Sequence, residues 1–528
     1  MSIFRNAKRA AFMALLALAA LPCRAEKIQY HEVKTDATGR IVPWHGSGPS
    51  EAYDFVVRRV FQFWIGMRNC PNGVPVYLQH QVWKPDEDDP RGLGGDQIPM
   101  ALSSWNLLYG YLGDEAVKKN MTFLADYWLA HGMSGPDVLW ANLPYPYNTE
   151  LHSGVYDGDM RAGKGFLQPD KAASFAAELI VLYKMTNEAK YLDAAAAMAN
   201  TLAARIEAGD ADHSPWPYRV NAKTGAVHTG TEKGKTYAAT YTSNYTGALR
   251  MFDDLIALGK GRTKDYARAS RMLTAWLKAY PVRTNKWGPF FEDIPTTVWS
   301  DTEHNADTMA MYILEHPSWD ADWKRTAKGI LDWSFGKFAN HEYEKWGVTA
   351  INEQTCYLVP GNSHTSRHAS VELLYCEKTG DCALKEDAIR RLNWATYTVD
   401  EDGKNRYIRD DNWLTDGYGD YVRHYLRAMA SMPELAPANQ NHLLRTSSVV
   451  QSIAYGDGRI TYTKFHSAST ERFKMGAWTP KSLRGGEMEW DAKTKVLTVK
   501  ATAKTVVISA RPAADQGIRP THYNRQQP

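Results

Sequence analysis

A polar cluster, an apolar helix, a short turn and a second amphipathic helix follow one another repeatedly between about residues 96 and 431. In one copy, Ala172, Phe175, Leu179 and Leu182 recur at the spacing of one helix face. The first helices of the copies are predicted to open near residues 96, 170, 244, 301, 363 and 416, at intervals of roughly 50 to 75 residues. Open solenoid repeats are shorter, about 34 to 47 residues. The repeat therefore predicts a mainly α fold, in which six helical hairpins close into an (α/α)6 toroid with an inner and an outer ring of helices.

The chain changes character near residue 441. Segments that begin at Arg459 and Val496 alternate polar and apolar residues with a period of two, which is typical of strands. We therefore expect the toroid to cover residues 26–440, and a small antiparallel β module to follow over residues 441–511. Residues 512–528 are polar, and we expect them to form a disordered tail.

The first 25 residues are typical of a secretory signal peptide. A basic start precedes an apolar stretch over residues 10–22, which is too short to span a bilayer, and Ala25 offers a small residue for cleavage. Cys23 leaves a lipoprotein as the less favoured alternative, because a proline precedes it where a lipidation signal has a small residue. The sequence thus predicts an exported protein, either periplasmic or secreted. No later segment stays apolar for long enough to suggest a membrane span.

Charge and cysteine content exclude some classes of function. Four of the 62 basic residues lie in the signal peptide, which leaves 58 against 59 acidic residues, and nothing indicates a nucleic-acid-binding protein. Four cysteines remain, and an even number in an exported chain favours disulfides. Cys376 and Cys382 flank a turn sequence, so we expect one bridge there and a second between Cys70 and Cys356. The spacings match no common zinc pattern, and we expect no metal and no cofactor.

The polar residues where the first helices open carry the functional signal. In a toroid of hairpins the first helices run parallel, so their N-termini meet at one mouth, where the helix dipoles favour anionic groups. Asp, Asn and Ser at such positions are also ordinary helix caps. Capping does not account for the excess of polar residues, and we expect these side chains to converge at the mouth: Asp96, Gln97, Lys171, Asn244, Tyr245, Asp301, Glu303, His304, His364, Arg367, His368, Asp416 and Tyr418.

Two chemistries fit such a mouth. Glycoside hydrolysis needs a protonated acid and an ionised carboxylate beside the scissile bond, and the candidates are Asp96, Asp301, Glu303 and Asp416. Elimination next to a uronate needs a base that abstracts the C5 proton, for which Tyr245 and His364 are candidates, and groups that neutralise the carboxylate. We assign substrate binding to Gln97, Lys171, Asn244, His304, Arg367, His368 and Tyr418. The cationic side chains among them favour an acidic sugar over a neutral one.

We expect the reacting centre where the fourth and fifth first helices open. Asp301 and Glu303 are two residues apart and point in different directions on a helix, so only one of them is expected to face the mouth. His364 and His368 are four residues apart and share a helix face, with Arg367 beside them. That face can hold a substrate carboxylate while an acid from another helix N-terminus, Asp96 or Asp416, acts across the bond.

Six helical hairpins followed by a β module resemble the (α/α)6 carbohydrate-active enzymes, which include uronic-acid-directed glycoside hydrolases and toroid polysaccharide lyases. The resemblance is architectural and covers about residues 50–510, and Asp307-Thr308-Met309 is similar to a segment of unsaturated glucuronyl hydrolases. It implies an exported glycoside hydrolase that acts on an acidic poly- or oligosaccharide. A polysaccharide lyase is the runner-up, and a non-catalytic glycan-binding protein is a lesser alternative.

Overall fold

The computed structural model describes residues 26–78, 97–150, 153–291, 295–408 and 416–512, with side chains from residue 420 onward in the last range. The predicted signal peptide and Asp96 lie outside the described residues, as do residues 513–528 of the predicted tail. The side chains of Asp416 and Tyr418 also lie outside them. Within the described part, no helix is long and apolar enough to cross a membrane.

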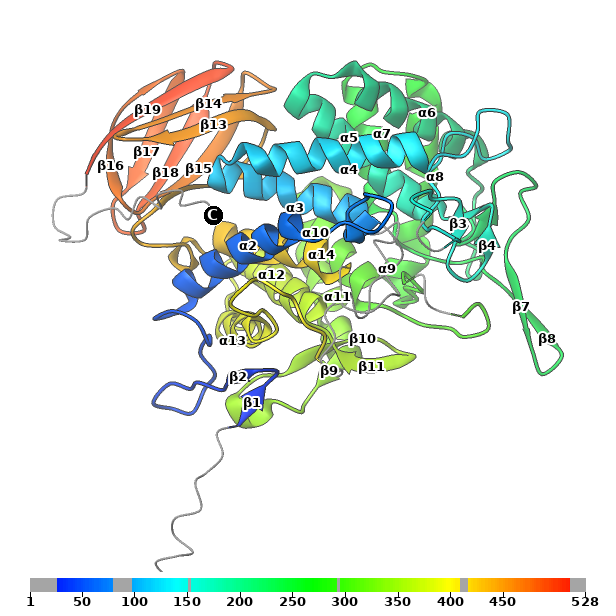
Figure 1. Cartoon of the computed structure of the whole chain (residues 1–528), viewed down its shortest axis with the longest axis horizontal. Coiled ribbons are helices and arrows are strands. Elements are labelled where there is room, and N and C mark those ends of the chain that lie inside the picture. Colours follow the sequence, from blue (N-terminus) through cyan, green and yellow to red (C-terminus); the bar gives the residue numbers. More distant parts are fainter. Residues whose placement is uncertain (1–25, 79–96, 151–152, 292–294, 409–415, 513–528) are drawn as a thin grey trace, which may run out of the picture.

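The contacts between helices of the described part of the chain define an inner ring of six, which Figure 1 labels. Each contacts the next in chain order, and the last one, α14, contacts the first, α3, so that the contacts close a circle. This cyclic order is the one that a toroid requires, and the predicted mainly α class is confirmed. The inner helices are α3 (Gln97–Leu112), α5 (Pro169–Thr186), α7 (Thr246–Ala257), α10 (Glu303–Glu315), α12 (Asn362–Thr379) and α14 (Asp416–Ser431).

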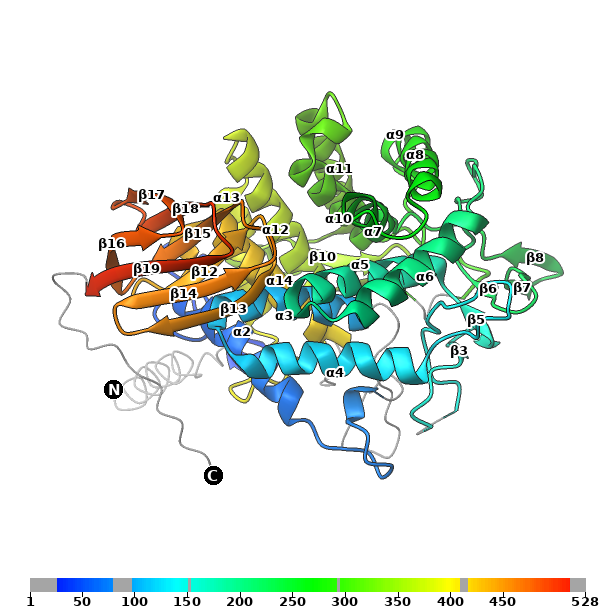
Figure 2. The same ribbon diagram turned by 90° about the horizontal axis from the view of Figure 1, so that it is seen from above.

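A second helix packs outside each inner one, as the repeat predicts. Seen from above, α8 and α11 lie further from the centre than α7 and α10 (Figure 2). The helix α2, which precedes the first hairpin, packs on α14 and so completes the outer set. The outer helices are α2 (Pro49–Gly66), α4 (Glu115–His131), α6 (Ala189–Arg205), α8 (Thr263–Ala279), α11 (Trp323–Phe338) and α13 (Lys385–Thr396).

The two sets of helices differ in burial, as their positions dictate. Along α8, Tyr266, Ala269, Leu273 and Leu277 are buried at helical spacing while the opposite face is exposed. In α5 nearly every residue from Pro169 onward is buried, because neighbours enclose the helix on all sides. Polar residues on inner helices are therefore held in a sheltered environment, where their partners decide their charge.

Two four-stranded antiparallel sheets form the β module (Figure 1). Their strand orders are β12-β15-β18-β17 and β13-β14-β19-β16. The module lies at the C-terminal ends of inner helices, where Tyr455 donates a hydrogen bond to the Gly110 carbonyl (2.6 Å) and Glu377 accepts from Arg445 and Arg472 (2.6 and 2.7 Å). The strands are β12 (Asn441–Thr446), β13 (Val450–Gly456), β14 (Arg459–Lys464), β15 (Ser469–Met475), β16 (Trp478–Arg484), β17 (Gly486–Asp491), β18 (Val496–Ala501) and β19 (Thr505–Pro512).

Short elements occupy the connections before the inner helices. The strand pairs and the three-stranded sheet β11-β10-β9 lie mostly in these connections. The elements are β1 (Lys27–Ile28), β2 (His31–Glu32), η1 (Val76–Leu78), β3 (Gly158–Asp159), β4 (Gly163–Lys164), β5 (Phe166–Leu167), β6 (Val220–Asn221), β7 (Thr229–Glu232), β8 (Lys235–Ala238), α9 (Pro281–Thr284), η2 (Pro317–Trp319), β9 (Ala339–Asn340), η3 (Glu344–Trp346), β10 (Ala350–Gln354), β11 (Tyr357–Pro360) and η4 (Pro433–Leu435).

One of the two expected disulfides forms. Cys376 and Cys382 are bridged across the turn between α12 and α13, which confirms the first prediction. The predicted bridge between Cys70 and Cys356 is wrong: Cys70 is buried, Cys356 is exposed, and the two are not joined. The turn sequence held a local signal for the first pair, whereas the second pair was assigned only by elimination.

Candidate functional site

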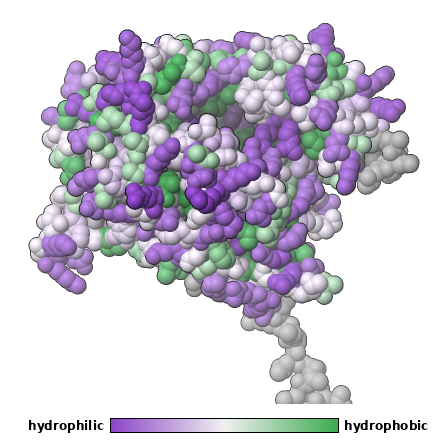
Figure 3. Space-filling model, turned by 180° about the vertical axis from the view of Figure 1, so that it is seen from behind, coloured by the Kyte–Doolittle hydropathy of each residue, from purple (hydrophilic) through white to green (hydrophobic). Residues whose placement is uncertain are grey.

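Contacts between helix N-termini define the mouth of the ring. Side-chain hydrogen bonds join the starts of α5 and α7, of α10 and α12, and of α12 and α14. A cavity of about 430 Å³ extends from this mouth through the ring to β12. All six inner helices contribute to its wall, which includes Lys171, Asn244 and His304 near the mouth and Arg427 and Leu444 at greater depth. The space-filling view from behind shows a hollow in which hydrophobic side chains are rimmed by hydrophilic ones (Figure 3).

Glu303 at the start of α10 binds two residues of α12. Its Oε2 accepts a hydrogen bond from His364 Nδ1 at 2.9 Å and another from Arg367 Nη1 at 2.6 Å. Burial raises the pKa of the Glu303 carboxyl, and the charge of Arg367 offsets only part of that effect. The structure thus brings the fourth and fifth helix N-termini together, as the sequence predicts, and it gives His364 a carboxylate partner on one ring nitrogen.

Asp420 of α14 joins this group to the cavity wall. It pairs with Arg367, with Arg423 and with the hydroxyl of Ser363. Burial alone would raise the pKa of Asp420, but the two guanidiniums outweigh it and hold the pKa well below its usual range. Asp420 is therefore an ionised carboxylate whose charge is already neutralised, which makes it a structural anion rather than a free acid or base.

His304 forms part of the cavity wall as a neutral imidazole. Burial holds the pKa of His304 well below its usual value, and the charge of Arg367 lowers it further. The ring stacks on Phe290 with centroids 3.6 Å apart, and Nδ1 is buried without a hydrogen-bond partner. His304 therefore offers the cavity a neutral ring nitrogen rather than a cation.

Lys171 of α5 contacts the same phenylalanine as His304. Its ammonium donates to the Phe290 carbonyl at 2.7 Å and to Asp170 Oδ2 at 3.1 Å, and it lies 3.4 Å from the centroid of the Phe290 ring. Asn244 donates to the same carboxylate oxygen at 2.9 Å. Lys171 and Asn244 both line the cavity. Lys171 and Asn244, which were both predicted to bind substrate, therefore lie close together and share Asp170 as a partner.

The structure places three predicted site residues in other surroundings. Tyr245 is fully buried, its hydroxyl donates to the Trp216 carbonyl at 2.9 Å, and burial raises its pKa well above the usual value, so it does not suit a base. Asp301 accepts hydrogen bonds from the backbone N–H groups of residues 287 and 288 at 3.0 and 2.9 Å, so it holds that loop in place. His368 is fully buried and donates to Asp307 at 2.7 Å. Their partners correct the expectation that these three converge at the mouth, and for Asp301 this agrees with the expectation that only one of Asp301 and Glu303 faces it.

The imidazole of His368 is protonated, so neither ring nitrogen is free to act as a base. Burial alone would lower its pKa, but Asp307 and Glu372 outweigh burial and raise the pKa to about 10. Its second ring nitrogen lies 3.3 Å from Glu372. His368 is thus an ion-pair link between α10 and α12, directly beneath His364. Gln97 is buried at the start of α3.

The sequence missed the charged residues of α14 and the middle of the cavity. Asp420, Arg423 and Arg427 stand at helical spacing on α14. That spacing was a usable signal, since charges on one face of an inner helix must find partners or line a cavity. Within the described part of the chain, no cluster of His, Cys, Asp and Glu could hold a metal ion.

No family model and no curated protein sequence matches this chain. A sugar epimerase from a ruminal bacterium is similar in structure, with a TM-score of 0.54 at 12% identity over 73% of this chain and 99% of the epimerase. Cellobiose 2-epimerase from Spirochaeta thermophila gives a TM-score of 0.50 at 13% identity, over 73% and 97% of the two chains. An unsaturated glucuronyl hydrolase specific for heparin gives 0.46 at 9% identity, over 74% and 99%. The chain therefore shares the fold of carbohydrate-active enzymes of the (α/α)6 type, as the sequence predicts.

Proposed function

We propose that this chain is an enzyme that removes the proton next to the carboxylate of a uronic acid and thereby cleaves a glycan by β-elimination. The observation that carries the proposal is the contact of Glu303 with His364 at 2.9 Å. A carboxylate that holds Nδ1 fixes the tautomer and leaves Nε2 of the imidazole to act as a base. The fold supports a sugar as substrate, because similar structures are named as sugar epimerases.

The proposed reaction needs only one proton carrier. Nε2 of His364 takes the C5 proton, the electrons of the C–H bond form the C4–C5 double bond, and the C4–O bond breaks with its electron pair on oxygen. The imidazolium then returns the proton to the departing oxygen. Lys171 and His304 line the cavity near the mouth, where they can bind the uronate carboxylate, and Glu303 stabilises the imidazolium.

Hydrolysis of a uronic-acid-containing glycan is the second candidate, and one observation favours it. Burial raises the pKa of Glu303, as a general acid requires. Two features count against it: Glu303 is fully buried in an ion pair with Arg367 (2.6 Å), and Asp301 is bound to backbone amides. The remaining candidate acids, Asp96 and Asp416, lie outside the described side chains.

A screen of acidic polysaccharides in D2O tests the proposal. Elimination creates a double bond conjugated to the carboxylate, so we expect new ultraviolet absorbance together with new chain ends. New reducing ends without absorbance would indicate hydrolysis. Deuterium at C5 without chain cleavage would indicate epimerisation, and binding without any turnover would indicate a glycan-binding protein. Each of these three outcomes would overturn elimination.

A pair of variants assigns the activity to the site. His364→Ala is expected to abolish ultraviolet-absorbing product while the fold is retained, since the imidazole is the base. His316→Ala is the matched control, because His316 is exposed near the end of α10, away from the mouth. If His364→Ala keeps near-normal turnover, the base is a different group.

A further inference from the structure

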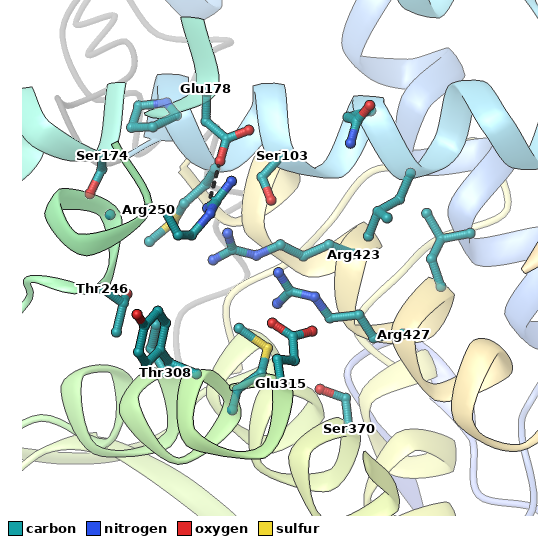
Figure 4. A pocket seen from close by; sticks show the side chains of 18 of the residues that line it. Ser103, Ser174, Glu178, Thr246, Arg250, Thr308, Glu315, Ser370, Arg423 and Arg427 are labelled. Atoms are coloured by element: carbon teal, nitrogen blue, oxygen red, sulfur yellow. Dashed lines mark ion pairs between the residues drawn. The ribbon is translucent and has the colours of Figure 1, made fainter. Parts of the chain in front are cut away.

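Three arginines meet around the middle of the cavity, below the mouth. Arg250 comes from α7, and Arg423 and Arg427 come from α14 (Figure 4). Arg250 lies one turn inside α7, whereas Asn244 precedes that helix, and Arg427 lies one further turn beyond Arg423. The side chains of Arg250 and Arg427 therefore come from deeper in the ring than those of Lys171 and Asn244.

The anions of this region do not satisfy all three guanidiniums. Glu178 pairs with Arg250 at 2.9 Å, and Asp420 pairs with Arg423 but also with Arg367. Nε of Arg423 is buried without a hydrogen-bond partner. Arg427 makes no hydrogen bond or ion pair with any described residue. Glu315 also lines the cavity, but it is exposed at the end of α10 and forms no ion pair with Arg427.

An unpaired guanidinium in such a place is costly to the protein. Apolar side chains such as Met311 and Leu426 share the cavity wall with Arg427. Burial and the neighbouring charge of Arg423 lower the pKa of Arg427 to about 9, and the charges of Glu315 and Asp420 offset only part of that effect. An arginine whose charge destabilises the unliganded protein is most simply explained by a ligand that it binds. The paired N–H donors of a guanidinium match the two oxygens of a carboxylate.

We propose that Arg250, Arg423 and Arg427 form an oxyanion subsite that holds the carboxylate or sulfate of a second acidic sugar. The proposal rests on the proposed function, because it takes the first acidic sugar to lie at the mouth. A cavity of about 430 Å³ is of the size that binds small ligands. A substrate with acidic groups on neighbouring sugars would reach both places, whereas an isolated uronate would reach only one.

Binding measurements on the full chain test the subsite separately from catalysis. The probes are sodium sulfate and the mono- and disaccharides of glucuronate, galacturonate and mannuronate, measured by calorimetry and by thermal shift. We expect one disaccharide to bind at least 10-fold more tightly than its monosaccharide. Arg427→Gln is expected to remove that advantage. Arg271→Gln, at an exposed position on α8, is the matched control and is expected to keep it.

The unliganded proteins give a second readout. Arg427→Gln is expected to keep or raise Tm without ligand, since it removes an unpaired charge, whereas a structural arginine would lower Tm on replacement. The inference is overturned if Arg427→Gln binds the disaccharide as the wild type does, if no probe binds, or if Tm falls. Arg427-dependent binding of sulfate without any disaccharide advantage would also overturn it, in favour of a free inorganic anion. Failure of the proposed function looks different: the disaccharide advantage persists, but no elimination product forms.

Discussion

Replacement of Glu303 by glutamine tests the candidate base and the residue that positions it. The carboxylate accepts from His364 at 2.9 Å and from Arg367 at 2.6 Å. Glutamine keeps the size of the side chain but presents a neutral amide, so His364 loses the charge that fixes its tautomer and stabilises its imidazolium. Loss of such a carboxylate lowers kcat by about 10²- to 10⁴-fold, which corresponds to about 3 to 5 kcal/mol of transition-state stabilisation.

The same substitution also affects stability, because Glu303 is fully buried. Removing one partner of a buried ion pair costs about 3 to 5 kcal/mol. Here Asp420 continues to neutralise Arg367, so we expect a loss of about 2 kcal/mol, or a fall in Tm of about 4 °C in a large domain. A loss of turnover measured well below this Tm therefore cannot come from unfolding.

The assay is a set of kcat and KM values for the substrate found in the screen, measured with Tm on the same samples. Asp301→Asn is the control: it replaces a nearby carboxylate that clamps the backbone of residues 287 and 288, so it should lower Tm and leave kcat within about 3-fold. The double variant of Glu303→Gln with His364→Ala should lose no more than His364→Ala alone, since Glu303 acts through His364. Near-normal kcat in Glu303→Gln, or additive losses in the double variant, would refute this reasoning.

Three further outcomes follow from contacts outside the reacting centre. The folded-state pKa of His368 is about 10, above its usual 6.5, so its contribution to stability is complete below pH 6.5 and is lost as pH rises towards 10. Urea titrations at a series of pH values should show this fall in the unfolding free energy in the wild type and not in His368→Gln. Glu377→Ala removes the partner of Arg445 and Arg472 and should lower the unfolding free energy by about 2 kcal/mol, with lysine at position 377 more damaging still. Serine at both Cys376 and Cys382 opens a short disulfide loop and should cost about 2 kcal/mol in the same measurement, with turnover unchanged.

The fold was readable from the sequence because helix starts leave local signals. Helices were expected to open near residues 96, 170, 244, 301, 363 and 416, and the inner helices begin at residues 97, 169, 246, 303, 362 and 416. The first β-strand of the module begins at Asn441, where the period of the pattern changes from 3.6 to two. Capping residues and hydrophobic periodicity are properties of a few neighbouring residues, so they need no knowledge of tertiary contacts.

The site was readable only in part, because the direction of a side chain depends on distant segments. Glu303, His364 and Arg367 could be placed together, since the N-terminal turns of neighbouring inner helices must meet. The burial of Tyr245 could not be foreseen, because its hydroxyl bonds to a carbonyl at residue 216, in the preceding loop. Asp301 likewise finds its donors in an irregular segment. Nothing in the local sequence predicts either partner.

One carboxylate connects the mouth to the middle of the cavity. Asp420 binds Arg367, which holds Glu303, and it also binds Arg423, which lines the cavity wall. An anion bound at Arg423 competes with Asp420 for that guanidinium, and Asp420 is then left with more of its charge for Arg367. Arg367 would then attract the Glu303 carboxylate less strongly, and Glu303 is the partner of His364. The proposed subsite and the candidate base are therefore linked by one chain of alternating charges, which runs from Arg423 through Asp420 and Arg367 to Glu303.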